Sequence, residues 1–458
     1  MTTRTETDNM GSIKIDDKHH WGAQTERART FFNYPTPMPT NLIKNIALVK
    51  QAAAHANSQL GLLDPDKAHA IQEVAQEIID HKHPQAFPLP VWISGSGTQC
   101  NMNINEVIAN LANLKLGHQK GSNTPIHPND DVNKSQSTND IFPTAMHITS
   151  ATMLHDQLLP ALQSLSESLS KKSRQWQDII KIGRTHLQDA VPLTLGQEFS
   201  GFVSQLEANQ QRLQANLPEL YQLCLGGTAV GTGLNAPNAY AQKAIAWLAA
   251  QTQLPFTEAP NKFALQASHD CLVSVMGDLK RLAVTLFKIV NDLRLLGSGP
   301  RCGLGELNLP KNEPGSSIMP GKVNPTQCES IAMICAQVMG YDVAVSIAGS
   351  GGHLQMNVYK PLIIYNICES ITLLASSCVH LKNFTVDTIE PNLEHINQHL
   401  NNSLKLVTAL NPYIGYDKAS QLAHYAYQHH TTLEEANQIL KMLPMAQFKK
   451  LIDPKNLV

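Results

Sequence analysis

The segment that decides the fold is LVSVMGDLKRLAVTLFKIVNDLRLL, which covers residues 272–296. Apolar side chains recur in it at alternating steps of three and four residues, at Leu272, Val275, Leu279, Leu282, Leu286, Ile289, Leu293 and Leu296. This spacing places all eight side chains along one face of an α-helix. The segment therefore predicts a helix far longer than the usual mean of about 11–12 residues. Its apolar face must pack against other helices.

Three other segments in the middle of the chain predict long helices of the same kind. Apolar residues step by threes and fours between Ile148 and Leu169, and further apolar segments follow Pro325 and cover residues 358–379. Long helices with wide apolar faces pack into bundles, and an apolar face left over on a bundle favours association with further copies of the chain. The sequence therefore predicts an all-α, mostly helical fold around a central bundle of long helices.

The two ends of the chain differ from this middle part and indicate additional domains. Proline-rich connectors separate shorter helical segments near the N-terminus, whereas the C-terminal part is polar and rich in histidine. In that part, Thr432 and Glu435 have the spacing of a capping box that opens a short helix. We therefore predict an N-terminal helical domain at residues 1–138, a central long-helix domain at 139–392 and a small C-terminal helical domain at 393–458.

Composition and charge favour a cytoplasmic enzyme with a small partner. The 458 residues include 35 basic and 37 acidic side chains, with a formal net charge of −2 and no basic block. This balance gives no support for nucleic-acid binding or for a membrane-surface patch. Eight cysteines lie singly along the chain, as expected for reduced thiols. The N-terminus has no apolar leader, and we expect no apolar run of membrane-spanning length.

Four polar segments place small hydroxyl or amide side chains where helices are expected to begin or in a polar connector. They are SGSGTQCN at 94–101, SQSTND at 135–140, GRTHLQD at 183–189 and GKVNP at 321–325, where Asn324 is the expected N-cap and Pro325 the first helical residue. Helix N-termini carry free N–H groups and partial positive charge, which bind anions. Each segment alone is typical of ordinary capping. Together with Lys322 they favour a pocket for carboxylates.

Two nucleotide-binding patterns and one metal pattern fail on spacing. Gly231 and Gly233 have the spacing of a dinucleotide-binding loop, but no third glycine follows at the required distance. Five residues separate Gly315 from Gly321, where a P-loop has four, and Val323 stands where a P-loop has Ser or Thr. His395 and His399 have the i, i+4 spacing of a metal pair, but no third ligand accompanies them, which favours a solvated helix face. We therefore expect neither a metal nor an organic cofactor.

Seven motifs together resemble the class II fumarases of the fumarase/aspartase superfamily, in the same order along nearly the whole chain. They are WGAQTERA (21–28), SGSGTQCNMNINEV (94–107), HPNDDVNKSQSTND (127–140), KIGRTHLQDAVPLTLGQE (181–198), LGGTAVGTGLN (225–235), GSSIMPGKVNP (315–325) and GYDKAS (415–420).

The resemblance implies a three-domain helical protomer whose central helices form a homotetrameric core, with each active site built from three subunits. The implied activity is the reversible, stereospecific hydration of fumarate to (S)-malate in the tricarboxylic acid cycle, without metal or cofactor. By the same resemblance, Ser316 abstracts the C3 proton, and His186, paired with Glu329, activates water. The implied substrate-binding residues are Ser96, Gly97, Thr98, Ser137, Thr138, Asn139, Thr185, Ser317, Lys322, Val323 and Asn324.

A second, entrance-side dicarboxylate site is implied at His127, Pro128, Asn129 and Asp130. Thr124 stands where some relatives have a basic residue, so a purely structural turn is an equal alternative.

Two other functions stay open on the same scaffold. An aspartate ammonia-lyase is disfavoured because His186 stands where aspartases usually have glutamine. A catalytically silent helical scaffold is disfavoured because the polar residues that the resemblance assigns to substrate binding and proton transfer are present. They are Ser96, Thr98, Asn139, His186, Ser316, Lys322 and Asn324.

Overall fold

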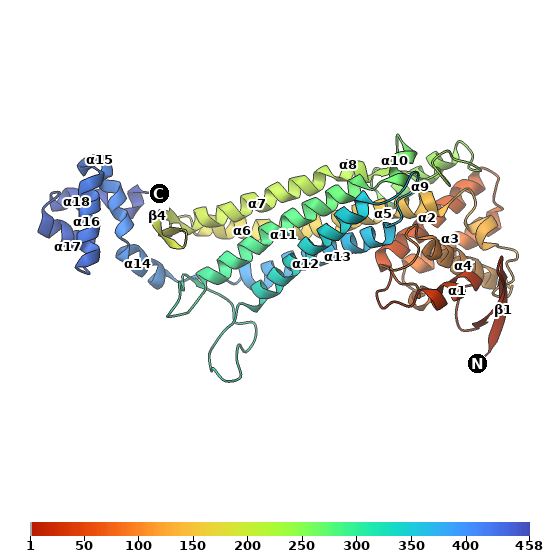
Figure 1. The fold of residues 1–458 in the computed structure, drawn as a ribbon, viewed down its shortest axis with the longest axis horizontal. Helices are drawn as coiled ribbons and strands as arrows, with labels where there is room; N and C mark the ends of the chain where they lie inside the picture. The colour runs from red at the N-terminus through yellow and green to blue at the C-terminus, as the bar shows by residue number, and fades with distance from the viewer. Residues whose placement is uncertain (1) are drawn as a thin grey trace. The chain divides into compact units, whose positions relative to one another are not determined.

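The structure, a computed structural model, describes residues 2–458 and is mostly helical (Figure 1). By its internal contacts the chain divides into two compact units. Unit 1 comprises the residues up to Pro160, Gln211–Ala283 and Ala336–Ala375, and unit 2 comprises Ala161–Gln210, Val284–Cys335 and Ser376–Val458. These units do not coincide with the three predicted domains, whose boundaries stay a prediction.

Unit 1 holds the N-terminal hairpin and the helices from α1 to η3, together with α8, α9 and α10. Its complete elements are β1 (Thr3–Asp8), β2 (Gly11–Asp16), α1 (Ala23–Phe31), α2 (Thr40–Gln59), α3 (Pro65–Ile79), η1 (Pro84–Ala86), α4 (Thr98–Lys115), η2 (Pro128–Val132), α5 (Thr138–Met153), η3 (Leu154–Leu158), α8 (Leu217–Leu220), β5 (Gln222–Leu223), α9 (Tyr240–Thr252), β6 (Thr257–Glu258) and α10 (Lys262–Ala267).

Unit 2 holds a second hairpin and the C-terminal helices. Its complete elements are β3 (Ile180–Thr185), β4 (Gln188–Thr194), β7 (Leu307–Asn308), η4 (Lys382–Val386), β8 (Glu390–Pro391), α14 (Leu393–Asn402), η5 (Leu404–Leu410), α15 (Asn411–Ile414), α16 (Tyr416–Gln428), α17 (Leu433–Leu440), α18 (Met445–Leu451) and η6 (Pro454–Asn456). Five long helices have residues in both units: α6 (Leu159–Gln175), α7 (Leu195–Ala215), α11 (Asp270–Leu296), α12 (Thr326–Ser350) and α13 (Lys360–Leu381).

The predicted long helices are present. The helix expected from the segment at 272–296 is α11, and all eight of its periodic apolar residues are buried, with no side chain more than 6% exposed. Polar contacts join α11 to its neighbours within each unit: Lys280 donates to Asp342 of α12 at 2.7 Å, and Asn209 of α7 donates to Thr285 at 2.9 Å. The periodicity therefore predicted the buried face correctly. The segment 148–169 forms α5, a π-helical turn and α6 in succession.

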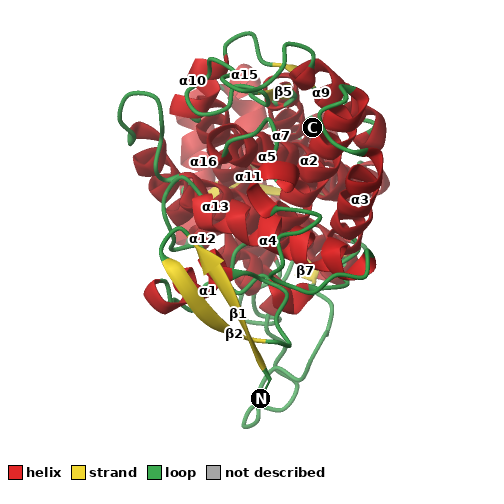
Figure 2. Cartoon of the chain, turned by 90° about the vertical axis from the view of Figure 1, so that its right-hand side faces the viewer, coloured by secondary structure: helices red, strands yellow, loops and turns green. Residues whose placement is uncertain are grey.

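The N-terminal hairpin and α1 are anchored on α4. The strands β1 and β2 pair antiparallel (Figure 2). The first turn of α1 has no cap from its own N-cap residue, Gly22. Glu106 of α4 supplies that cap, because its carboxylate accepts hydrogen bonds from the backbone N–H groups of Gly22, Gln24 and Thr25 at 2.8–3.1 Å. The WGAQTERA segment is thereby attached to the helix whose N-terminus contains Thr98.

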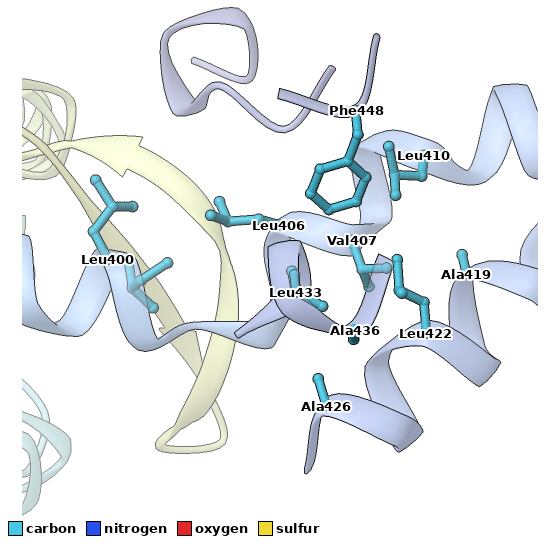
Figure 3. Packing of buried hydrophobic residues seen from close by; sticks show 11 residues of the cluster. Leu400, Leu406, Val407, Leu410, Ala419, Leu422, Ala426, Leu433, Ala436 and Phe448 are labelled. Atoms are coloured by element: carbon cyan, nitrogen blue, oxygen red, sulfur yellow. The ribbon is translucent and has the colours of Figure 1, made fainter. Parts of the chain in front are cut away.

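The C-terminal helices pack around a small apolar core of their own. In Figure 3 the ring of Phe448 from α18 lies beside Leu410 and Val407. The capping box predicted at Thr432 is present, since its hydroxyl accepts from the N–H of Glu435 and the Glu435 carboxylate accepts from the N–H of Thr432. The cluster comprises Ile182, Leu400, Leu406, Val407, Leu410, Ala419, Leu422, Ala426, Leu433, Ala436 and Phe448.

Two helices are more apolar than expected. By length and composition alone, α12 and the stretch Lys360–Val386 could each cross a membrane, so the prediction that no run approaches this length was wrong. The most apolar window of Lys360–Val386 is 61% buried, as in the core helix of a soluble protein. The corresponding window of α12 is only 33% buried, and Val343 and Ile347, one turn apart, are exposed. Exposed apolar patches of this kind mark interaction surfaces.

Candidate active site

The first group of predicted residues lies at the N-terminus of α4 in unit 1. Hydroxyl groups form a chain there: Ser96 Oγ is 2.8 Å from both Ser94 Oγ and Thr98 Oγ1. Gly97 is the N-cap residue, with a left-handed φ of 80°, and a Cβ atom at this position would collide with the ring of Phe142. Only glycine allows this backbone to approach α5 so closely. The exposed Thr98 therefore lies directly beside the start of α5.

The second group lies at the N-terminus of α5, where Ser137 and Asp140 form a capping box. Asn101 of α4 donates to the hydroxyl oxygen of Thr138 at 3.0 Å, which joins the two helix N-termini. Asn139 donates one of its two side-chain N–H groups to the carbonyl oxygen of Ala229 at 2.8 Å, so the second N–H is the donor left for an anionic ligand. The structure thus brings Ser96–Thr98 and Ser137–Asn139 together, in the arrangement expected of an anion site.

Asp140 organises this group, and sequence reasoning missed it. Its buried carboxylate accepts hydrogen bonds from the N–H groups of Ser137, Gly226 and Thr228 at 2.9–3.0 Å. Burial raises the pKa of Asp140 to about 6, and these three hydrogen bonds oppose the rise. The segment from Gly226 to Ala229 is therefore attached to the start of α5 at two points. The capping-box spacing from Ser137 to Asp140 was the sequence signal that could have found it.

The proposed second dicarboxylate site is a tight turn in this structure. The ring of His127 accepts hydrogen bonds from the N–H groups of Asn129 and Asp130, both at 3.2 Å, and thereby caps the π-helical turn that begins at Pro128. A cavity of about 310 Å³ adjoins it, lined by His127, Pro128 and Asn129 but also by three acidic residues, Glu6, Asp8 and Glu106. Arg4 and Arg27 pair with Glu6 and Asp8, but no lysine or arginine among the described residues lines this cavity itself, so its carboxylate wall offers a doubly negative ligand little attraction.

Thr185 and His186 lie at the tip of the second hairpin, in unit 2. The turn between β3 and β4 consists of His186 and Leu187, with φ values of 55° and 59°. A two-residue turn with both residues left-handed is the type favoured by hairpins, but it usually contains asparagine or glycine. Non-glycine residues in this region store strain, which is typical of functional sites. The turn exposes the imidazole of His186 to solvent.

The GSSIMPGKVNP segment forms a loop closed at its base. A Cβ atom at Gly315 would collide with the carbonyl oxygen of Lys322, and the side chain of Asn324 donates to the carbonyl oxygen of Gly315 at 2.6 Å. The prediction that Asn324 caps the next helix was therefore wrong: α12 begins at Thr326, and the amide of Asn324 closes the loop instead. Ser317 and Lys322 are exposed, and Val323 is half-buried.

Ser316 accepts two backbone hydrogen bonds inside this loop. Its Oγ atom is 3.3 Å from the nitrogen of Ile318 and 3.1 Å from that of Met319. Glu329 lies in the first turn of α12 and is exposed. Within the part of unit 2 that the structure describes, no hydrogen bond or ion pair joins Glu329 to His186. A single chain therefore does not form the predicted pair.

Charged residues surround the hairpin that carries His186. Glu306, which is fully buried, forms ion pairs with Arg184 at 2.7 Å and Lys181 at 2.9 Å, both from β3. His399 of α14 lies 3.2 Å from the same carboxylate. The prediction that His395 and His399 form a solvated face was therefore wrong for His399. Among residues 2–458, no group of three or more His, Cys, Asp or Glu side chains could hold a metal ion.

Comparison with known proteins agrees with this fold and these polar segments. The model of the Lyase family matches residues 11–340, and the model described as Fumarase C C-terminus matches residues 406–458. The class II fumarate hydratase of Prochlorococcus marinus is 54% identical over 99% of this chain and 98% of its own length. That of Ralstonia nicotianae is 53% identical over the full length of both chains.

Solved structures give the same result. The recombinant class II fumarase from Schistosoma mansoni superposes with a TM-score of 0.96 at 40% identity, over 99% of this chain and 98% of that one. A fumarate lyase:delta crystallin from Brucella melitensis gives 0.95 at 42% identity, over 99% of each chain. Fold and polar segments thus define a lyase of the fumarase and delta-crystallin type. More narrowly, the chain belongs to the family of class II fumarate hydratases.

Proposed function

We propose that this chain catalyses the reversible hydration of fumarate to (S)-malate, a reaction of the tricarboxylic acid cycle. The observation that carries the proposal is the identity of more than half of all residues, over the full chain, to class II fumarate hydratases. The curated relatives give no support for an ammonia-lyase or a catalytically silent scaffold.

The polar segments suit the charge that this reaction develops. Removing a proton from the carbon beside a carboxylate leaves a dianionic aci-carboxylate, which preorganised donors and cations must stabilise. We propose that the two helix N-termini of one subunit bind the substrate carboxylates together with groups from the hairpin and the loop of neighbouring subunits. The proposed binding residues are Ser96, Gly97, Thr98, Ser137, Thr138, Asn139, Thr185, Ser317, Lys322, Val323 and Asn324.

We assign the proton transfers to Ser316 and His186. Ser316 abstracts the C3 proton of malate, and the two N–H groups that it accepts from favour its ionised form. The exposed imidazole of His186 activates water in the hydration direction and assists departure of the hydroxyl group in reverse. Glu329 orients this imidazole. Because the two side chains do not pair within one chain, we propose that they meet across a subunit interface.

We propose that the active protein is a cytoplasmic homotetramer whose active sites are shared between subunits. The exposed apolar residues of α12, among them Val343 and Ile347, support association with further copies. For His127, Pro128, Asn129 and Asp130 we propose a structural turn in preference to a second substrate site, because the adjoining cavity is lined by carboxylates.

Fumarate absorbance tests the reaction directly. Malate should yield fumarate and aspartate should not. Release of fumarate from aspartate alone would make the chain an ammonia-lyase, and folded protein without turnover on any C4 dicarboxylate would make it a scaffold.

Ser316→Ala should lose kcat far more than it changes KM, and His186→Asn should lower kcat in both directions. His155→Asn, at an exposed histidine beside Asp156, is the matched control. Wild-type kinetics in Ser316→Ala or His186→Asn would remove that residue from the mechanism.

A further inference from the structure

Lys50 of α2 is a fully buried lysine with no exposed surface. It is the one charged side chain of the segment IALVKQAAAHAN (46–57), with histidine counted as neutral. Burying an ammonium group costs free energy unless neighbouring groups compensate for the lost water. A leucine or methionine would fill the same space without this cost. The presence of lysine therefore calls for a role that an apolar side chain cannot perform.

The ammonium group of Lys50 contacts the loop that precedes α5. Its Nζ donates to Asn133 Oδ1 and to Gln136 Oε1, both at 2.9 Å. The same Asn133 oxygen also accepts from Asn101 and Asn105 of α4, at 3.2 and 3.3 Å. One side-chain oxygen thus joins α2, α4 and this loop, and Lys50 is the charged donor among its partners.

Asn57, seven residues after Lys50, holds the same loop at a second point. Seven residues are two helical turns, so both side chains lie on one face of α2. The amide of Asn57 donates to the carbonyl oxygen of Lys134 at 3.0 Å and accepts from the hydroxyl of Ser135 at 2.8 Å. Ser135 has a left-handed φ of 62°, a conformation that a serine keeps only when its surroundings hold it there.

The loop held in this way leads without a break into Ser137, Thr138 and Asn139. We propose that Lys50 is a positioning residue for the substrate: through Asn133 and Gln136 it fixes the conformation in which these three residues meet a dicarboxylate. The proposal rests on the proposed function, since it concerns the same site. Lys50 itself is covered by protein and touches no substrate.

The charges around Lys50 fit this role. Burial lowers the pKa of Lys50 to about 7, and the negative charges of Asp140 from α5 and of Cys100 from α4, where ionised, oppose this decrease. Burial holds the pKa of the Cys100 thiol at about 12, so Asp140 is the effective counter-charge. In its protonated form, Lys50 behind the N-terminus of α5 adds to the positive potential that this helix end presents to an anion.

The test compares three variants of the complete enzyme. Lys50→Met keeps the length of the side chain and removes both hydrogen bonds and the charge. Gln136→Met removes one acceptor of Lys50 from the half-buried loop, together with the hydrogen bonds that the Gln136 amide donates to the carbonyl oxygens of Val132 and Lys134. Lys172→Met is the control, because Lys172 is another buried lysine, which donates to the carbonyl oxygen of Ile389 in unit 2.

The kinetic readout separates positioning from folding. If Lys50 positions the loop, KM for malate and for fumarate should rise about tenfold in Lys50→Met, the factor expected for one net charged hydrogen bond. Gln136→Met should raise KM by a smaller factor, and the double variant should show less than the product of the two effects. The control should keep the wild-type KM. Binding of succinate, measured by calorimetry, should weaken in parallel with KM.

Two outcomes would overturn the proposal. If Lys50→Met lowered only the activity per amount of protein, while KM and succinate binding stayed unchanged, the lysine would contribute to stability alone. If Lys50→Met did not fold, an unchanged KM in Gln136→Met would exclude the loop contact as a determinant of binding. Absence of turnover in the wild-type protein would instead refute the proposed function, so the two failures are distinguishable.

Discussion

The strongest prediction for stability concerns Glu306, at the centre of the charged cluster around β3. Its carboxylate pairs with Arg184 and Lys181, and Lys181 is also 2.8 Å from Glu198. Glu306→Gln keeps the size of the side chain and removes its charge. Lys181 then keeps Glu198 as its only carboxylate partner among the described residues, and Arg184 loses its ion pair. The two cations on β3 then have less negative charge beside them than is needed to offset the water that they lose on burial.

The expected cost follows from the burial of the cluster. Removing one partner from a buried ion pair costs about 3–5 kcal/mol. Because Lys181 keeps Glu198, we expect the lower limit, about 3 kcal/mol, which corresponds to roughly a hundredfold change in an opening equilibrium. Hydrogen exchange of peptides that cover residues 180–194, measured on the assembled protein, should therefore accelerate by about that factor. Since His186 lies at the tip of this hairpin, kcat should fall as well.

A matched control and a pH series complete the test. Glu390→Gln removes the exposed partner of Lys172 and should leave exchange unchanged. Burial acts to raise the pKa of Glu306, but Lys181 and Arg184 outweigh it and hold this pKa below its ordinary value of 4.5. The stabilisation is therefore fully present above pH 4.5 and is lost as the pH falls through the lower folded-state pKa.

Wild-type exchange, corrected for its intrinsic pH dependence, should consequently accelerate below pH 4.5, and Glu306→Gln should lack this response. Exchange in Glu306→Gln as slow as in the wild type at neutral pH would refute the stabilising role of the cluster.

Two further predictions concern other parts of the chain. Phe448→Ala should destabilise the C-terminal helices by about 3–5 kcal/mol, since the ring is fully buried; accelerated exchange at residues 404–452 would report this, and unchanged protection there would contradict it. His127→Asn should leave kcat and KM for malate unchanged, because the ring caps a turn beside a carboxylate-lined cavity. If this variant lost activation by substrate, or lost substrate binding, a second dicarboxylate site would be favoured instead.

Local sequence patterns predicted the parts of the fold that depend on neighbours in the chain. The spacing of apolar residues at 272–296 predicted the buried face of α11, and the spacing from Thr432 to Glu435 predicted a capping box. Both features follow from helical periodicity and from hydrogen bonds within one turn. The prediction that Asn324 caps a helix was wrong for the opposite reason. Its side chain bonds to Gly315, nine residues away, and no local sequence pattern indicates that the loop closes there.

The supporting residues of the candidate site escaped prediction because their partners are distant in sequence. Lys50 bonds to residues 83 and 86 positions later, and Arg184 to a carboxylate 122 positions later. From the sequence alone, a single lysine in a helix predicts an exposed side chain, and only the fold shows that Lys50 is buried. The resemblance to class II fumarases named the residues expected to touch substrate, but the residues that hold those segments in place emerged only from the structure.

The loop at residues 315–325 explains part of how a serine can act as a base. A hydrogen bond to a charged group contributes about 1 kcal/mol more than one to a neutral group. Two backbone N–H groups donate to the Ser316 oxygen. They should therefore stabilise its alkoxide by about 2 kcal/mol, which raises the ionisation constant of the hydroxyl roughly thirtyfold. A free serine hydroxyl ionises far too weakly at neutral pH for this factor to suffice. If Ser316 abstracts the proton, as proposed, the larger share must come from a cation brought close in the assembled site, and the exposed Lys322 of the same loop is a candidate.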